Sequence, residues 1–414
     1  MENIYSRFSS KIFLSLSFLF LWSFKLSATT YYVSSSGDDS RSLQTAQNIN
    51  TPWKTLAHVS QVSSNFQPGD QILFKRGEVF LGTLAINASG SSGNPIVFGA
   101  YGDGNLPEIT GFTNLTGWQQ KSGSIWEATV PGGLSYLNTV VINGAAKAVG
   151  RYPNIMAANQ GYLTYDNFNT NTSITDSKLA GQNWTGGQIV MRKTRWIIDR
   201  SEISSQNGTT INYNSASGYG GAKGYGYFIQ NHPSTLDIEG EWYYQNGKLG
   251  IYAGSNPNNY QVRASVTETL VQLSNQNNLS FQNLRLSGGA VSGFDINTSQ
   301  NISINNCEVL FSGKNAINAN NTQSLSVQNT LVSHTNNNAI SINVGNGTIL
   351  RNNTIKSTGV YAGMGDGGDG TYEGITIGGD NNQITGNVID STGYIPLSFS
   401  GNNVTIKNNI ITNF

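Results

Sequence analysis

The amino-acid sequence predicts an all-β protein, a right-handed parallel β-helix built as a solenoid of coils about 23 residues long. Asn283, Asn306, Asn329 and Asn352 follow one another at intervals of 23 residues, and a fixed period in this range marks a solenoid. Each repeat also holds an apolar–polar–apolar triplet such as 340–342, which as a strand turns two side chains inward and one outward.

The N-terminal residues 1–28 have the pattern of a secretory signal peptide. Arg7 and Lys11 supply positive charge, the apolar run 12–22 follows, and a polar mature start comes near Thr29. The apolar run is shorter than the ~20 residues of a membrane span. We therefore expect secretion to the extracellular space or the cell surface, no membrane insertion after signal cleavage, and a protein that acts as a monomer.

Residues 29–112 are expected to form an N-terminal cap and the first coils. The segment 52–59 places Trp53, Leu56 and Val59 on one helical face, which predicts a short capping helix. A solenoid needs such a cap because its terminal coil otherwise exposes the core. Strands are predicted at 71–75, 84–86 and 96–98.

Residues 113–266 are less regular and rich in aromatic side chains, so we expect an irregular, elaborated β-rich region or side module there. Residues 267–414 hold the regular repeats. The coil between Asn352 and Gly386 spans 34 residues, eleven more than its neighbours, which predicts an insertion within residues 360–374.

The regularly spaced asparagines are predicted to form a buried ladder. Stacked coils lie ~4.8 Å apart, so like side-chain amides repeat at hydrogen-bonding distance. Replacing Asn329 by leucine is then expected to destabilise the fold by ~1–3 kcal/mol, because buried polar groups lose their partners. The sequence reaches Phe414 in mid-coil, which predicts that a C-terminal cap lies beyond it.

The composition argues against nucleic-acid and nucleotide binding. The net charge is zero, only 11% of residues are charged, and the sequence has neither a basic patch nor a phosphate-binding glycine motif after a strand. A neutral chain is also a poor match for a strongly anionic substrate. The single cysteine, Cys307, has no partner for an internal disulfide, so the repeat architecture must supply the stability.

Several N-terminal segments, together with the asparagine coils, carry a family resemblance. The chain resembles secreted bacterial proteins of the pectin-lyase-like superfamily, in the right-handed parallel β-helix group, through 31–34, 52–56, 68–70, 74–77, 92–96 and 99–102. The resemblance spans nearly the whole mature chain and implies action on a polysaccharide, as a lyase or a glycoside hydrolase. Segments 150–154 and 240–244 are similar to segments of β-helical glycoside hydrolases, but no motif matches an active site closely enough to carry over a catalytic residue.

The insertion supplies the acidic catalytic candidates Asp366, Asp369 and Glu373. Long insertions in a regular array are often functional, although a glycine-rich run can also be a flexible tip. The insertion should lie along one side of the strand face that carries Asp295 and Asn318. We take these two residues as substrate-binding candidates. A hydrolase needs two carboxyl groups, and these acids are the available source.

Lys314 and His334 occupy the same turn region on successive coils and are further catalytic candidates. A lyase needs a base, and also a cation or metal that stabilises the developing enolate. The alternative for His334 is a turn residue hydrogen-bonded to backbone. The glycine–aspartate run 365–370 weakly resembles calcium-binding repeats, so calcium is a possible cofactor.

The remaining substrate-binding candidates are Tyr361 and Tyr372 of the insertion, Arg151 and His232. Arg151 suits a carboxylate, or it anchors the side module. His232 follows the glycine- and tyrosine-rich stretch 218–227, whose alternative interpretation is a loop with core aromatic residues.

Taken with the resemblance, these residues predict a secreted carbohydrate-active enzyme with a polysaccharide or glycan as its partner. We favour a glycoside hydrolase over a polysaccharide lyase. The alternative is a non-catalytic, adhesin-like protein that binds glycans outside the cell.

Overall fold

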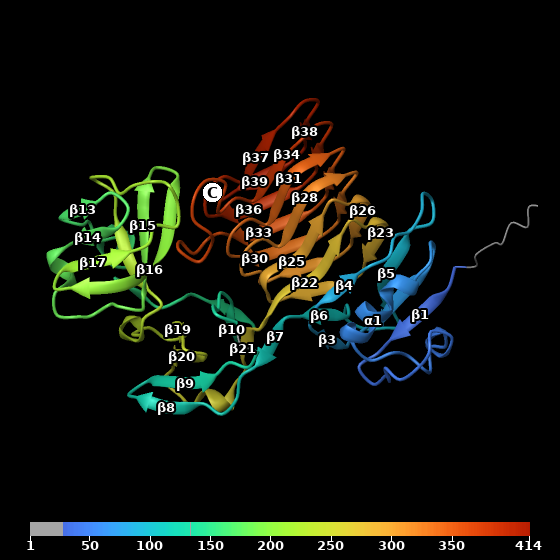
Figure 1. The fold of residues 1–414 in the computed structure, drawn as a ribbon, viewed down its shortest axis with the longest axis horizontal. Helices are drawn as coiled ribbons and strands as arrows, with labels where there is room; N and C mark the ends of the chain where they lie inside the picture. The colour runs from blue at the N-terminus through green and yellow to red at the C-terminus, as the bar shows by residue number, and fades with distance from the viewer. Residues whose placement is uncertain (1–27, 133) are drawn as a thin grey trace, which may run out of the picture.

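The computed structural model describes residues 28–132 and 134–414. Its centre is a stack of parallel strands that runs from the blue N-terminal end to the red C-terminal end, with antiparallel sheets to one side (Figure 1). The predicted signal peptide lies almost wholly outside the described residues. Among the residues described, no helix is long and apolar enough to cross a membrane.

The solenoid has three rows of parallel strands. The first row contains β1 (Thr30–Val33), β2 (Gln71–Lys75), β5 (Ile96–Tyr101), β23 (Asn277–Gln282), β26 (Gln300–Asn305), β29 (Ser326–Gln328), β32 (Ile349–Arg351), β35 (Gln383–Thr385) and β38 (Thr405–Lys407). The second contains β4 (Leu84–Ile86), β22 (Thr267–Ser274), β25 (Gly289–Asn297), β28 (Ile317–Gln323), β31 (Ile340–Asn346), β34 (Ile375–Gly378) and β37 (Leu397–Ser400). The third contains β3 (Val79–Leu81), β6 (Glu108–Thr110), β24 (Arg285–Ser287), β27 (Glu308–Leu310), β30 (Leu331–Thr335), β33 (Thr354–Thr358), β36 (Val388–Thr392) and β39 (Ile410–Thr412).

The strand register confirms the predicted repeat. Ser280 pairs with Ser303 and Ser303 with Ser326, so each coil advances by the predicted interval. Ile349 then pairs with Gln383, and the extra residues of that coil leave the array between β33 and β34. The all-β parallel β-helix and its one long insertion are therefore both confirmed.

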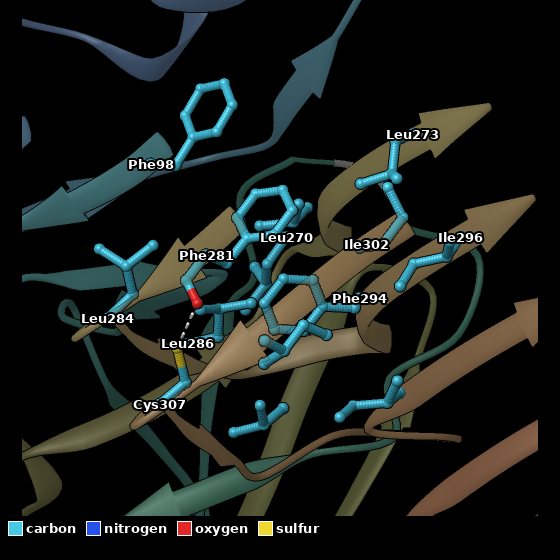
Figure 2. Packing of buried hydrophobic residues seen from close by; sticks show 14 of the residues in the cluster. Phe98, Leu270, Leu273, Phe281, Leu284, Leu286, Phe294, Ile296, Ile302 and Cys307 are labelled. Atoms are coloured by element: carbon cyan, nitrogen blue, oxygen red, sulfur yellow. Dashed lines mark hydrogen bonds between the residues drawn. The ribbon is translucent and has the colours of Figure 1, made fainter. Parts of the chain in front are cut away.

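The solenoid core is a column of inward-facing apolar side chains (Figure 2). The rings of Phe98 and Phe281 stack at 5.3 Å between centroids, and Phe294 meets Phe281 edge-on. Cys307 lies in the same column, where burial raises the pKa of its thiol to about 12. Adjacent coils thus bury like residues against like, which is why a sequence period produces a continuous core.

A short helix lies against the N-terminal end of this core, as predicted. α1 (Leu56–Val62) begins after Thr55, whose side-chain oxygen accepts a hydrogen bond from the backbone N–H of His58. Its Leu56 and Val59 side chains are fully buried. The 3-10 turns of the described chain are η1 (Thr45–Gln47), η2 (Ser63–Asn65), η3 (Ala158–Gly161), η4 (Ser177–Leu179), η5 (Pro233–Thr235) and η6 (Pro257–Asn259).

The prediction of a buried ladder at the spaced asparagines was wrong by one position. Asn306, Asn329 and Asn352 are exposed, and their φ angles lie between 51° and 54°. These turns require the left-handed backbone conformation, which asparagine and glycine tolerate best. The buried asparagine ladder lies one residue later and only in the last three coils, where Asn353 donates to Asn387 and Asn387 donates to Asn409.

Replacing Asn387 by alanine is expected to lower the free energy of unfolding by about 1–3 kcal/mol. The change removes the acceptor of the Asn353 amides and the donor to the carbonyl of Leu350, all of them buried. The matched control is Asn329→Gly, because glycine keeps the left-handed turn and should change stability by less than ~0.5 kcal/mol. Denaturant unfolding measures both, and equal losses would contradict the shifted ladder.

Between the first coils and the regular array, the chain forms three antiparallel sheets. One contains β7 (Phe112–Asn114), β10 (Val140–Ile142), β11 (Ala145–Lys147) and β21 (Val262–Ser265), and the next contains β8 (Gln119–Ser122), β9 (Ile125–Thr129), β19 (Trp242–Gln245) and β20 (Lys248–Tyr252). The third, here called the side sheet, contains β12 (Arg151–Tyr152), β13 (Asn167–Asn169), β14 (Ser173–Thr175), β15 (Gln188–Thr194), β16 (Ile197–Asn207), β17 (Thr210–Tyr213) and β18 (Tyr227–Gln230).

Candidate active site

The insertion leaves the solenoid after β33 and reaches the side sheet. Gln230 on β18 donates to the carbonyl oxygen of Gly363 at 2.9 Å, and Arg200 on β16 donates to the same oxygen at 3.2 Å. The backbone N–H of Gly368 donates to Asp199 at 3.2 Å. The insertion is therefore held by polar contacts to a rigid sheet, which argues against the interpretation as a free flexible tip.

Asp199 also belongs to a fully buried ion pair. Its Oδ2 lies 2.9 Å from the Nζ of Lys193, and the two side chains are 1% and 0% exposed. Ser215 and Ser217 complete the polar surroundings of this pair. One carboxylate thus neutralises a buried ammonium group and anchors the insertion at the same time.

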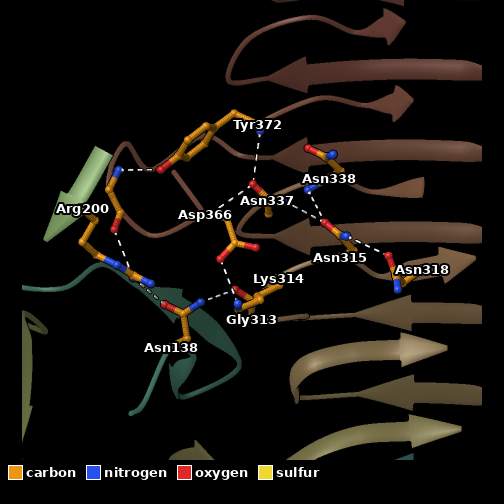
Figure 3. Close-up of polar contacts among 11 residues, drawn as sticks. Asn138, Arg200, Gly313, Lys314, Asn315, Asn318, Asn337, Asn338, Asp366 and Tyr372 are labelled. Carbon is orange, nitrogen blue, oxygen red and sulfur yellow. Dashed lines mark hydrogen bonds and ion pairs between the residues drawn. The ribbon is translucent and has the colours of Figure 1, made fainter. Parts of the chain in front are cut away.

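The middle and the C-terminal end of the insertion are held by two neighbouring asparagines of the solenoid (Figure 3). The side-chain oxygen of Asn337 accepts from the backbone N–H of Asp366 at 3.2 Å and from that of Tyr372 at 3.4 Å. The oxygen of Asn338 accepts from the N–H of Glu373 at 2.9 Å. The backbones of Asp366 and Glu373, seven residues apart in sequence, are thereby held by neighbouring asparagines.

Asp366 sits in a charged, partly open setting. Its Oδ1 lies 2.9 Å from the Nζ of Lys314, and about a third of each side chain is exposed. Arg200 lies beside this pair and donates to Asn138 at 3.2 Å, while Asn138 donates to the carbonyl oxygen of Gly313 (Figure 3). The structure therefore presents Asp366 as an accessible carboxylate framed by two cations.

Glu373 sits in the opposite kind of setting. It is only 3% exposed, and within the described chain its Oε2 atom has no hydrogen-bond partner. Burial raises the pKa of this carboxyl group, with a smaller opposing effect from a hydrogen bond to Thr376. A buried carboxyl group with a raised pKa keeps its proton to higher pH and can serve as a general acid.

The raised pKa of Glu373 predicts a pH-dependent stability difference. Burial favours the protonated carboxyl in the folded protein, so its contribution is complete below the ordinary pKa of 4.5 and is lost as pH rises through the raised folded pKa. Glu373→Gln has no proton to lose, and the variant should gain stability relative to wild type across that range. Unfolding measured from pH 4 to 8, with Asp369→Asn as the exposed control, tests the sign, and a constant difference would contradict it.

A hydrogen-bonded chain of polar side chains continues from the insertion along the solenoid face. Asn337 donates to Asn315 at 2.9 Å, and Asn315 donates to Asn318 at 3.2 Å. Asn318 donates to Asp295 at 2.8 Å. The predicted strand face is thus connected through Asn337 to Asp366, as a continuous polar wall.

Three further residues complete the cluster and were not among the sequence-based candidates. The hydroxyl of Tyr136 has a raised pKa, first because of burial and then because of the negative charges of Glu268 and Asp366. Tyr136 therefore lies near both carboxylates. Glu268 could have been found by extending the second strand row back from Gln272, whereas Tyr136 and Arg200 lie in the irregular region, where no repeat indicates their position.

Of the other predicted catalytic residues, Asp369 and His334 lie apart from the Asp366–Glu373 pair. Asp369 is exposed and accepts a hydrogen bond from the hydroxyl of Tyr219 at 2.6 Å. His334 has a left-handed turn conformation, its Nδ1 lies 2.8 Å from the hydroxyl of Ser333, and burial followed by Lys356 lowers its pKa. His334 is thus a turn residue, but its Nδ1 meets a side-chain hydroxyl and not the backbone.

The predicted substrate-binding residues divide between the site and the side sheet. Tyr372 is buried, its hydroxyl accepts from the N–H of Gly363, and burial raises its pKa to about 12, while Tyr361 is partly exposed. His232 uses Nδ1 to accept from the N–H of Ser234 at the start of η5. Arg151 lies over the ring of Phe228 at 3.6 Å and donates to backbone carbonyls.

The glycine–aspartate run that suggested calcium is engaged by protein groups. Asp366 pairs with Lys314, and Asp369 accepts from Tyr219. Within residues 28–132 and 134–414, no group of three or more His, Cys, Asp or Glu side chains is placed to hold a metal ion.

Comparison with known proteins supports the fold and gives partial matches in sequence. No family model matches the chain. A solved structure described as a glycoside hydrolase superposes with a TM-score of 0.52 at 13% identity, over 92% of this chain and 96% of that one. The chain has the parallel β-helix fold.

Two other matches are named as lacto-N-biosidases. The enzyme of Bifidobacterium longum subsp. longum is 39% identical over 80 residues, which is 19% of this chain and 5% of that protein. The GH136 lacto-N-biosidase of Eubacterium ramulus superposes with a TM-score of 0.40 at 14% identity, over 92% of this chain and 56% of that one. The chain thus spans only a small part of its curated relative.

Proposed function

We propose that this protein is a secreted glycoside hydrolase in which Glu373 is the general acid and Asp366 is the second carboxylate. The observation that carries the proposal is that one insertion holds two acids in opposite environments. Glu373 is buried with a raised pKa, and Asp366 is ion-paired and accessible. Glycoside hydrolysis needs this division of roles.

In this proposal the proton of Glu373 passes to the glycosidic oxygen as the bond from that oxygen to the anomeric carbon breaks. Asp366 either attacks the anomeric carbon or removes a proton from the attacking water, and water supplies the new hydroxyl group. Lys314 holds the carboxylate of Asp366 in place through the ion pair. The polar wall from Asn337 to Asp295 offers hydrogen bonds to the sugar hydroxyl groups.

The partial identity to a lacto-N-biosidase supports a carbohydrate-active enzyme. The pairing of Lys314 with Asp366 supports hydrolysis over β-elimination, because a lysine engaged in an ion pair is not a free base. The signal-peptide pattern supports export to the extracellular space or the cell surface, where the protein would act as a monomer on a glycan.

The test is a panel of polysaccharides and oligosaccharides, with and without chelator, followed by new reducing ends and ultraviolet absorbance together. Reducing ends without new absorbance would support hydrolysis. Rising absorbance would instead indicate β-elimination and an unsaturated product. Retention of glycan with neither product would favour the adhesin-like, non-catalytic alternative, and loss of activity with chelator would bring a metal into the reaction.

A further inference from the structure

A cavity lies between the side sheet on one side and, on the other, the insertion and turns of the solenoid. Its volume is about 400 Å³, within the ~300–1,000 Å³ range of small-molecule sites. Three arginines line it, together with aromatic and apolar side chains: Arg151, Arg192, Arg195, Ile155, Met156, Tyr162, Trp196, Ile198, Tyr372 and Tyr394. The Asp366–Glu373 chemistry uses none of the three arginines.

The charge of this cavity is one-sided. Among its described lining residues there is no aspartate or glutamate. In the described chain, none of the three guanidinium groups has a carboxylate within the distance of an ion pair. Arg192 and Arg151 donate to backbone carbonyls, which orients them without neutralising them. A concave site with charge of one sign attracts ligands of the opposite sign, even though the whole chain is neutral.

Large aromatic side chains at the rim of the cavity are exposed and are not part of a hydrophobic core. Trp196 is 47% exposed and Tyr394 is 42% exposed, on opposite components of the structure, the side sheet and a solenoid turn. Exposed apolar surface gathered around a concave site is a feature of ligand-binding grooves. The flat faces of these two aromatic side chains suit the apolar face of a sugar ring, while the arginines suit an anionic substituent.

We propose that this arginine cavity binds an acidic sugar residue, one that carries a carboxylate or a sulfate group. Guanidinium groups recognise both oxyanions through paired hydrogen bonds. The claim that this sugar is part of the cleaved glycan rests on the proposed function. Binding by the cavity stands without it.

The cavity adjoins the proposed catalytic acids. Tyr372 lines it, and Glu373 is the next residue. Ile198 on β16 also lines it, and Arg200 lies two residues further along that strand, at ~7 Å, beside Asp366. A glycan that crosses the insertion would therefore contact both the arginine cavity and the proposed catalytic acids. The position of the acidic sugar in the cavity would then determine which glycosidic bond is cleaved by Asp366 and Glu373.

The test is calorimetric binding of three probes to the full chain: an oligogalacturonate, a sulfated oligosaccharide and a neutral xylo-oligosaccharide. We expect one acidic probe to bind, with an affinity that falls as salt rises. Arg192→Gln/Arg195→Gln should weaken that binding at least tenfold, and Arg195→Gln alone, whose side chain is exposed, should weaken it severalfold. The matched control is Arg76→Gln/Arg351→Gln, which removes the same charge elsewhere and should bind as wild type.

Equal binding of the neutral probe, or equal losses in the cavity and control variants, would overturn the inference. The preferred acidic probe identifies the carboxylate or the sulfate as the ligand. Arginine-dependent binding without any cleavage would leave the cavity assignment standing and contradict the proposed hydrolase. Cleavage by the double variant together with undiminished binding of the acidic probe would leave the hydrolase standing and contradict the cavity assignment.

Discussion

Replacing Glu373 by glutamine is expected to lower kcat by about 10²–10⁴-fold, with little change in KM. The substitution keeps the shape and the buried position but removes the proton that the leaving oxygen requires. Asp366→Asn should cause a comparable loss, because the second carboxylate is equally necessary in a two-acid mechanism. Initial rates on the substrate identified in the panel measure both variants.

Asp369→Asn is the matched control for these variants. Asp369 belongs to the same insertion but is exposed and held by Tyr219, away from the two acids. Its asparagine variant should keep at least about half of the wild-type rate, as expected for a surface substitution. A loss at Asp369 as large as that at Glu373 would show that the acids have been assigned wrongly.

Replacing Asp199 by alanine is expected to lower the free energy of unfolding by about 3–5 kcal/mol. The change leaves the ammonium group of Lys193 fully buried without a counter-charge. It also removes the acceptor of the Gly368 N–H, so the insertion loses an anchor and activity should fall. Denaturant unfolding and initial rates measure the two effects.

The double variant Lys193→Met/Asp199→Ala separates stability from positioning. With both charges gone, most of the stability should return, since no unpaired charge remains buried. The anchor to Gly368 is still missing, so activity should stay low. Recovery of both properties together would contradict a positioning role for Asp199, and a double variant as unstable as the single one would contradict the ion-pair account.

The solenoid could be predicted from the sequence because its contacts repeat. The interval between Asn306 and Asn329 fixes which residues pair on adjacent coils, and the residues left over in one coil locate the insertion. The period does not reveal which residue of a turn is buried. The repeat alone predicts Asn329 as the buried position, whereas its left-handed backbone favours asparagine or glycine and the residue that follows is the buried one.

The candidate site could be predicted in part for the same reason. Asp366 and Glu373 stand in the insertion, and Lys314 stands in a solenoid turn whose position the repeat determines. Their approach depends on Asn337 and Asn338, which the register also places. Arg200, Tyr136 and the arginine cavity come from the irregular region, where long-range contacts decide the position of each strand and no period records them.

The most direct test of the central claim is the mass of the products formed by wild type, Glu373→Gln and Asp369→Asn from one defined oligosaccharide. Hydrolysis by Asp366 and Glu373 predicts fragments whose masses sum to that of the substrate plus one water, formed by wild type and Asp369→Asn but nearly absent with Glu373→Gln. Fragments that sum to the substrate mass alone, or full cleavage by Glu373→Gln, would contradict the assignment.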